Sequence, residues 1–385
     1  MTDFQTGIIT LMKCAVTGEP AQLPDGFSLE AAEAFAIKQN IVTLVYEGAA
    51  RCGVPVKDPV MQRLFQRYVR LMIHSEGQMR EFDRICKAFT DNGIDHLPLK
   101  GCTMKKHYPK PELRYMGDAD ILIRVEQYDR IQKIVEELGF TRGPENNYEC
   151  HWKNGQLHLE LHKALVPSDR SHFCGYWGNG WDRAKCLSGV SYSLSPEDDF
   201  LFQFTHFAKH YSNAGIGCRY VLDLWVFLRS HPNLNHEYLE QELEKLQLLE
   251  FYRNVRILIS VWFENRETDD RPDFMTDFIF SGSSWGNWIN SQVASAARKK
   301  EKHNKLHLFR MKVFPPRDKM VYRYPILKKA AFLLPLCWIL RIVHTLLRDP
   351  VDRRKGIRVL KEVSNENIAE YKRKLEYVGL HFEEE

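Results

Sequence analysis

The chain has 385 residues, of which 44% are hydrophobic and 27% are charged, and its formal net charge is +4. This length exceeds one ordinary hydrophobic core, so we expect two or three domains or subdomains in a globular chain. The small net charge does not by itself indicate a polyanionic partner. The nine cysteines form no CxxC pair and no regular spacing. This excludes a disulfide framework and a zinc knuckle, and it favours a reducing, cytoplasmic location.

The first part of the chain, residues 1–92, is predicted to be an N-terminal helical region. Ser28 is a suitable cap for a helix that continues to about Gly53. A second, longer helix follows Pro59 and ends at Asn92-Gly93. Its apolar stripe is expected to be core and comprises Phe65, Val69, Met72, Met79, Phe82, Ile85 and Phe89.

The pattern then changes to strands and short helices, and we expect an α/β core over residues 93–190. "IDHLPLKG" predicts a short strand that ends at Gly101, and "GDADILIRV" predicts a second strand. An amphipathic helix, "VEQYDRIQKIVEELGF", separates this strand from two more. The last two strands turn at Asn154-Gly155, a dipeptide that supplies the positive φ of a tight hairpin. The fold class is therefore α+β, with one compact mixed sheet.

Residues 191–385 are predicted to form a C-terminal helical domain with a basic segment. Ser195 as N-cap and Pro196 at the first helical position give its first helix a strong start. Residues 298–329 hold twelve Lys and Arg against two acids, which indicates either a solvated helix face, the favoured interpretation, or a surface for phosphates or anionic lipid. The apolar run 330–340 is too short to span a membrane. Pro335 within it favours a buried helix over an interfacial one, and peripheral membrane contact through 298–348 stays an alternative.

Two aspartates, Asp118 and Asp120, flank Ala119 at the start of the second predicted strand. Side chains alternate along a strand, so both carboxylates point to one face. Two carboxylates this close repel each other unless a positive charge lies between them. Mg²⁺ meets this need, because it prefers hard oxygen ligands and is held by one or two carboxylates plus substrate phosphates.

A later predicted strand carries polar residues at alternate positions, namely His158, Glu160 and His162. Glu160 stands between two leucines, which is costly for an unpaired charge unless its face is wet or lined by a metal. Glu160, Asp118 and Asp120, converging from neighbouring strands, would form a two-metal site for phosphoryl chemistry. The alternative is a sheet face that is simply exposed to solvent.

Candidate nucleotide contacts precede the aspartates. Gly101, at a strand-to-helix turn, lets a triphosphate approach the backbone, and the N-terminus of the following helix offers N–H donors. Lys100 lies beside it, and Arg114 lies four residues before Asp118. Both are cations suited to the β and γ phosphates.

The order of these motifs resembles the uncharacterised bacterial nucleotidyltransferases of the polymerase-β-like superfamily. The resemblance rests on "LKG", "YP.P.LR.MGDADILI" and "LHLELH", continues in "LFQFTHFAKH" and "RYVLDL", and covers about residues 30–345. The superfamily has a glycine turn, a carboxylate pair on the next strand and a third acid on a later strand. Gly101, Asp118, Asp120 and Glu160 match these positions, whereas the usual Gly-Ser or Gly-Gly turn is Gly101-Cys102 here.

The resemblance implies a nucleotidyltransferase-like core and a Mg²⁺-dependent enzyme, with Mn²⁺ as the alternative ion. Asp118, Asp120 and Glu160 would hold the metal and act in catalysis. The nucleotide would bind at Lys100, Gly101 and Arg114. The implied reaction transfers a nucleoside monophosphate from an NTP, such as ATP, to an acceptor hydroxyl and releases pyrophosphate. The acceptor stays open among a small molecule, a glycan precursor, a protein and an RNA.

Four further residues are candidates for the acceptor side or for support of the site. His162 either orients Glu160 or caps its strand. His206 and His210 share a helical face, and packing or an acceptor contact explains them better than a metal, because no third protein ligand is evident. Asp223, in an apolar helix, either pairs with a cation such as Arg219 or lines the cleft.

Two other functions are alternatives to nucleotidyl transfer. A DxD metal-dependent glycosyltransferase needs a nucleotide-binding α/β half before its DxD motif, and the preceding ninety or so residues are predicted to be helical. A non-catalytic binding module that retains the fold is expected to lose at least one of the three acids, and all three are present. Both patterns therefore favour the enzyme.

Overall fold

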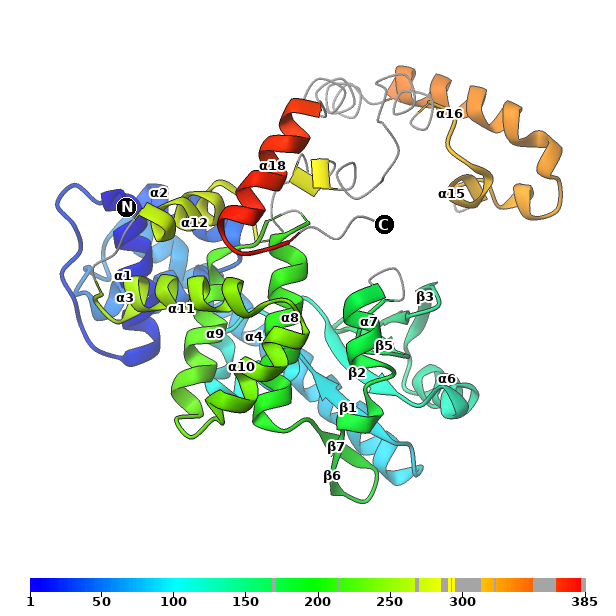
Figure 1. The fold of residues 1–385 in the computed structure, drawn as a ribbon, viewed down its shortest axis with the longest axis horizontal. Coiled ribbons are helices and arrows are strands. Elements are labelled where there is room, and N and C mark those ends of the chain that lie inside the picture. Colours follow the sequence, from blue (N-terminus) through cyan, green and yellow to red (C-terminus); the bar gives the residue numbers. More distant parts are fainter. Residues whose placement is uncertain are drawn as a thin grey trace. The chain divides into compact units, whose positions relative to one another are not determined.

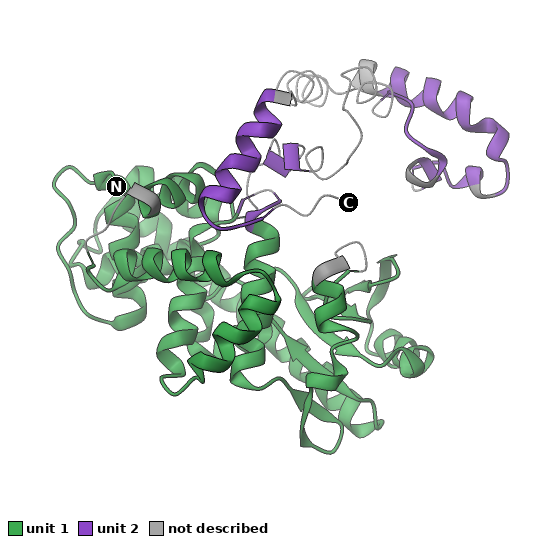
Figure 2. Ribbon diagram, in the orientation of Figure 1, with its two compact units in different colours: residues 1–210, 216–285 green, residues 211–215, 286–385 purple. Residues whose placement is uncertain are grey.

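The computed structural model describes the following residues: 1–167, 171–213, 215–266, 270–284, 290–291, 293–294, 313–321, 323–348 and 365–381. The chain forms two compact units, residues 1–210 with 216–285 and residues 211–215 with 286–385 (Figure 2). Every strand of the described part lies in the first unit, together with all the candidate site residues.

The first unit begins with four helices: α1 (Asp3–Thr17), α2 (Leu29–Gln39), α3 (Val42–Arg51) and α4 (Pro59–Asp91). Ser28 caps α2 as predicted, because its hydroxyl accepts a hydrogen bond from the Ala31 N–H at 3.2 Å. The single helix predicted from Ser28 to Gly53 is wrong, since the chain breaks at Asn40. That residue adopts a left-handed φ of 54° and ends α2, a conformation that asparagine tolerates better than most residues.

The long helix α4 begins and ends as predicted, with Asp58 as its cap and Pro59 at its first position. Its buried face differs from the predicted stripe in the first half of the helix, where Phe65 is 49% exposed. Leu64 and Tyr68 are buried there instead, because α4 packs against α2 and α3 at that end. In the second half the predicted stripe is confirmed, and it packs against the sheet through Phe82, Ile85 and Phe89.

One seven-stranded mixed sheet follows, in the order β3-β4-β5-β2-β1-β7-β6. Its strands are β1 (His96–Leu99), β2 (Ala119–Ile123), β3 (Thr141–Glu145), β4 (Glu149–Lys153), β5 (His158–His162), β6 (Lys185–Ser188) and β7 (Ser191–Ser193). The predicted mixed sheet is confirmed, whereas β3, β6 and β7 were not predicted. The pairs β2–β5 and β1–β7 are parallel, and the other pairs are antiparallel.

Short helices connect these strands: α5 (Gly101–Met104), η1 (Lys105–His107), η2 (Pro111–Leu113), η3 (Val125–Gln127), α6 (Tyr128–Glu137), α7 (Ser171–Trp177) and η4 (Trp181–Arg183). Helices α4 and α6 cover the apolar face of the sheet. That face is formed by Ala119, Ile121, Ile123, Cys150, Trp152, Leu159 and Leu161, all of them buried. Because side chains alternate along each strand, the intervening polar residues share the opposite face.

The β4–β5 hairpin closes as predicted, but for a different reason. Gly155 is not among the residues with positive φ. Instead, the side-chain oxygen of Asn154 accepts hydrogen bonds from the backbone N–H groups of Gln156 (2.9 Å) and Leu157 (2.8 Å). The turn is therefore held by an asparagine side chain that caps its own loop.

The rest of the first unit is helical: α8 (Pro196–Tyr211), α9 (Cys218–Ser230), α10 (His236–Lys245), α11 (Leu249–Phe263) and α12 (Asp270–Ser281). The predicted cap of α8 is confirmed, since the Ser195 hydroxyl accepts a hydrogen bond from the Asp198 N–H at 3.1 Å. In Figure 1 the strands lie at one end of this unit, α1, α2 and α12 lie at the other, and α8 to α11 lie between them.

The second unit contains α15 (Arg317–Val321), η5 (Pro325–Lys328), η6 (Ala331–Leu333), α16 (Leu334–Arg348) and α18 (Asn365–Tyr377). The prediction of a buried helix over 330–340 is wrong for one face of α16. Cys337 is buried, but Leu336, Ile339, Leu340 and Val343 are 45–58% exposed. None of the described helices has the length and hydropathy that a membrane crossing requires. Much of the basic segment 298–329 lies outside the described residues.

Candidate active site

The polar face of the sheet borders a cavity of about 220 Å³. The strand register builds this face: Asp120 on β2 lies opposite Glu160 on the parallel strand β5, and Glu160 lies opposite His151 on β4. The cavity is lined by all six residues that the sequence assigned to metal and nucleotide, namely Lys100, Gly101, Arg114, Asp118, Asp120 and Glu160. The fold therefore gathers these residues from four separate segments of the chain.

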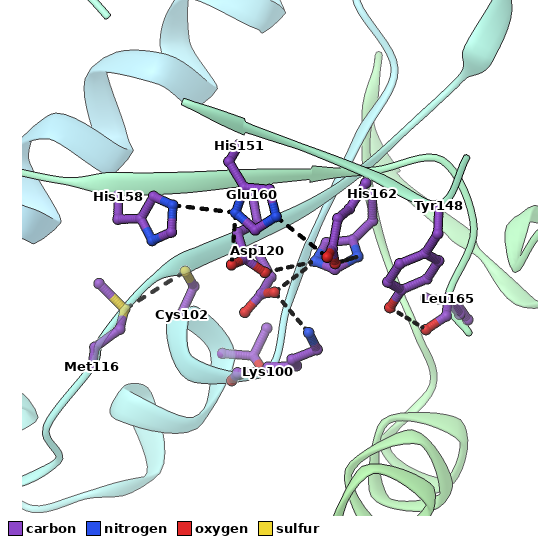
Figure 3. Close-up of polar contacts among 12 residues, drawn as sticks. Lys100, Cys102, Met116, Asp120, Tyr148, His151, His158, Glu160, His162 and Leu165 are labelled. Carbon is purple, nitrogen blue, oxygen red and sulfur yellow. Dashed lines mark hydrogen bonds and ion pairs between the residues drawn. The ribbon is translucent and has the colours of Figure 1, made fainter. Parts of the chain in front are cut away.

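Asp120 is the best-connected carboxylate of the face. It is 2% exposed, and its Oδ1 accepts hydrogen bonds from Lys100 Nζ at 2.7 Å and His162 Nε2 at 2.6 Å (Figure 3). Burial alone would raise the pKa of Asp120, but Lys100 and His162 overcome this effect and hold the pKa well below its usual range. Asp120 is therefore ionised at neutral pH, with both hydrogen bonds on one of its two oxygens.

His162 supports Asp120 rather than Glu160. Its Nε2 lies 3.7 Å from Glu160 Oε2, which is too far for a hydrogen bond, against 2.6 Å from Asp120 Oδ1. The ring is 1% exposed, and burial, followed by the charge of Lys100, lowers the pKa of His162. The neutral ring therefore donates its Nε2–H to Asp120.

The turn after β1 differs from the predicted glycine turn. The residue with positive φ is Lys100 (φ 49°, ψ −114°), a conformation that costs a non-glycine residue about 1–3 kcal/mol. Gly101 is needed for a close approach instead, since a Cβ there would lie 2.7 Å from Arg114 Nη1 and 3.1 Å from Met116 Cγ. The helix that follows, α5, has only four residues. The turn therefore aims the Lys100 ammonium at Asp120 while Arg114 packs over Gly101.

Asp118 and Glu160 lack the compensation that Asp120 has. Burial, and then the charge of Asp120, raise the pKa of Asp118. Burial, and then Asp120 and Asp118, raise the pKa of Glu160 to about 8. Three carboxylates thus share a partly desolvated face, and the Lys100 ammonium contacts one of them, Asp120. Such a face favours either a bound cation or a proton on Glu160.

Arg114 and Asp223 form a buried ion pair at the wall of the cavity. Arg114 donates from Nε (3.3 Å) and Nη2 (3.2 Å) to the two carboxylate oxygens of Asp223. Asp223 also accepts hydrogen bonds from Arg219 Nη1 at 3.1 Å and Tyr108 Oη at 2.7 Å. Both alternatives for Asp223 therefore hold, because it pairs with Arg219 and also lines the cavity.

His206 and His210, on α8, line the same cavity, with ring centroids 4.3 Å apart. Burial, and then His210 and Lys100, lower the pKa of His206 well below its usual value, so that its ring is neutral. Among the described residues, two groups offer ligand atoms within 4.8 Å of one another: Asp120 with Glu160 and His162, and His151 with His158 and Glu160. The α8 pair belongs to neither group.

Sequence reasoning missed the contribution of β4. Tyr148 and Glu149 line the cavity, and His151 contacts Glu160, with Nδ1 3.2 Å from Oε1. The signal was present in "YECHWK", where Glu149 and His151 alternate with the buried Cys150 and Trp152. The hairpin register with β5 was needed to turn that alternation into a position beside Glu160.

Comparison with known proteins gives one family and one structure. The model of a family described as an uncharacterised nucleotidyltransferase matches residues 26–264, a range that contains every residue lining the cavity. No curated protein matches the chain. A similar solved structure is the solution structure of the antibiotic-resistance factor ANT(2'')-Ia, with 14% identity over 48% of this chain and 94% of that chain. Its TM-score of 0.32 is too low to support an argument about this chain.

Proposed function

Because the chain belongs to the uncharacterised nucleotidyltransferase family and is a transferase of that class, we propose that it transfers a nucleoside monophosphate from an NTP to an acceptor hydroxyl and releases pyrophosphate. The observation that carries this proposal is the gathering of Asp118, Asp120 and Glu160 over one cavity that also contains Lys100. Phosphoryl chemistry uses such carboxylates to hold metal ions and uses nearby cations to bind phosphates.

The residues present fit a divalent metal ion. Asp118, Asp120 and Glu160 supply hard oxygen ligands, the type that Mg²⁺ prefers, with Mn²⁺ as the alternative. Burial, and then the neighbouring carboxylates, raise the pKa values of Asp118 and Glu160, so a bound cation would offset the repulsion on this face. Both hydrogen bonds to Asp120 use Oδ1, so Oδ2 is the oxygen we assign to a metal. Mg²⁺ held there would neutralise charge that develops on the phosphates during transfer.

The chain's own residues would perform the remaining steps. Glu160, which lies opposite Asp120 on β5, would accept the proton of the acceptor hydroxyl when the bound metal keeps it ionised. The acceptor oxygen then bonds to the α phosphorus, and the bond from that phosphorus to the bridging oxygen of the β phosphate breaks. Pyrophosphate leaves with the electron pair. Lys100 and Arg114 would offset the negative charge of the triphosphate from the cavity wall.

The acceptor would enter on the side of α8. His206 and His210 line the cavity from this helix. The neutral ring of His206 has one nitrogen that donates a hydrogen bond and one that accepts it, and both suit a polar substrate. A small molecule, a glycan precursor, a protein or an RNA can supply the hydroxyl. We further propose a reducing, cytoplasmic location, on the ground that the nine cysteines show no regular spacing in the sequence.

A transfer assay with labelled NTPs tests the proposal. Purified protein is incubated with each NTP, Mg²⁺ and host lysate, and label is followed into small molecules, RNA and protein while pyrophosphate is measured. Transfer should stop in EDTA and in Asp120→Asn, and it should persist in the matched variant Asp91→Asn, whose carboxylate is exposed. Calorimetry with each NTP gives a second measurement. Wild-type protein that shows neither transfer nor metal-dependent NTP binding would refute the proposal.

We also propose that α16 contacts an anionic membrane surface. Its exposed apolar residues recur at intervals of three and four, which places them on one helical face. They are Leu336, Ile339, Leu340 and Val343, and Phe332 of η6, 80% exposed, precedes them. The strongly basic segment 298–329 lies just before them in the chain. An exposed apolar stripe near basic residues is the pattern of a helix that lies in the membrane interface.

A further inference from the structure

A second cluster of metal-ligand type lies on the β4–β5 hairpin, beside the carboxylates already described. We propose that His151, His158 and Glu160 bind a transition-metal ion of the Zn²⁺ class. Two of the three ligands are imidazoles, which suit Zn²⁺, Cu²⁺ and Ni²⁺, whereas Mg²⁺ prefers oxygen. This site is therefore chemically distinct from the carboxylate site of the proposed transfer reaction.

The distances fit tetrahedral coordination. His151 Nδ1 lies 3.2 Å from His158 Nε2 and 3.2 Å from Glu160 Oε1, and all three ligand atoms lie within 4.8 Å of one another. With zinc–nitrogen bonds of about 2.0–2.1 Å, neighbouring ligands of a tetrahedral zinc ion are about 3.3 Å apart. Two of the three separations thus match the edge of such a tetrahedron without movement of the hairpin.

A second carboxylate orients one of these imidazoles. Glu149 Oε1 lies 3.3 Å from His151 Nε2, so the tautomer with its hydrogen on Nε2 donates to Glu149 and leaves the lone pair on Nδ1. That lone pair then faces the Glu160 oxygen, an arrangement that is repulsive unless a proton or a cation lies between the two atoms. A carboxylate behind a ligating histidine is a common feature of zinc sites, where it fixes the tautomer.

Glu160 is shared between the two sites. Its Oε1 faces His151, and its Oε2 faces His162 at 3.7 Å (Figure 3). His158 is exposed, and His151 and Glu160 are half-buried, so an ion reaches the cluster from solvent and keeps room for a water ligand. If Glu160 acts as proposed above, an ion at this second site coordinates its Oε1 and slows nucleotidyl transfer.

Calorimetric titration with Zn²⁺ in millimolar Mg²⁺, without nucleotide, tests the site directly. Wild-type protein should bind one equivalent, and the exposed ligand makes His158→Ala a safe variant that should weaken binding at least tenfold. Glu149→Gln should weaken binding by about tenfold to a hundredfold, the usual range for such supporting carboxylates. The control His236→Ala removes an exposed histidine of α10 and should bind Zn²⁺ like the wild type.

Two further measurements separate this inference from the proposed function. Asp120→Asn should lose Mg²⁺-dependent transfer but keep the Zn²⁺ affinity, because Asp120 is not a ligand of the second site. Co²⁺, added as a probe, should give the visible absorption of a tetrahedral ion in wild type and not in His158→Ala. Equal Zn²⁺ affinity in wild type and His158→Ala would overturn the inference and leave the transferase proposal intact. Loss of Zn²⁺ binding in Asp120→Asn with retention in His158→Ala would also overturn it.

Discussion

The ion network at the cavity wall gives a quantitative prediction for the substitution Asp223→Asn. Asp223 is 6% exposed, and its partners Arg114 and Arg219 are 7% and 5% exposed. The carboxylate accepts four hydrogen bonds, two from Arg114, one from Arg219 and one from Tyr108. The amide keeps the shape of the side chain but removes the negative charge that pairs with two buried guanidinium groups.

The expected cost follows from the burial of these charges. Removing one partner of a buried ion pair destabilises a protein by about 3–5 kcal/mol, because the other charge is left uncompensated. With two cations sharing one carboxylate, we expect the upper part of that range. Each kcal/mol lowers the melting temperature of a domain of about 150–250 residues by about 2–4 °C, so a loss of about 4–5 kcal/mol should lower Tm by about 8–20 °C.

Urea and thermal unfolding, followed by tryptophan fluorescence, measure this loss, and the buried Trp225 on the same helix serves as a local probe. Asp91→Asn is the matched control. It removes the same charge from an exposed pair with Lys87, and exposed pairs contribute about 0–1 kcal/mol. A free energy of unfolding for Asp223→Asn within about 1 kcal/mol of wild type would refute the reasoning that this carboxylate stabilises the network.

Three further predictions concern the turn after β1, a half-buried acid on α8 and the exposed face of α16. Gly101→Ala should destabilise the fold by about 1–3 kcal/mol, as overpacking does, because the new Cβ would lie 2.7 Å from Arg114 Nη1. The same substitution should impair transfer. Thermal unfolding that matches wild type would contradict this prediction. Burial raises the pKa of Asp199 to about 7, whereas the unfolded chain releases that proton near pH 4, so this residue makes stability fall as pH rises between about 4 and 7. Urea unfolding at pH 5 and pH 8 should show a smaller loss for Asp199→Asn than for wild type, and equal losses would exclude this role. In flotation with liposomes of anionic lipid, wild-type protein should float and the double variant Leu336→Glu/Ile339→Glu should not. The control Ile326→Glu, which changes an exposed residue outside the stripe, should still float. Failure of the wild type to float would rule out the membrane contact.

The sequence determined the features that depend on neighbours along the chain. The alternation around Ala119 and Leu159 assigned one apolar and one polar face to β2 and β5, and the caps Ser28 and Ser195 set helix starts. Such signals act over a few residues, so they are visible without a fold. The three acids, the turn lysine and the family resemblance were all available at this level.

Only the tertiary structure decided which of these faces meet. Register between strands depends on partners far apart in sequence, and it brought the unpredicted Glu149 and His151 against Glu160. Arg114 also donates hydrogen bonds to Asp223, which is far away in the sequence. An arginine before a DxD motif does not by itself reveal this partner. Likewise, hydropathy alone favoured burial of residues 330–340, whereas the packing partners around Cys337 cover only one side of α16. The local sequence pattern determines which side chains lie on a face, and the packing of distant segments determines which groups those side chains contact.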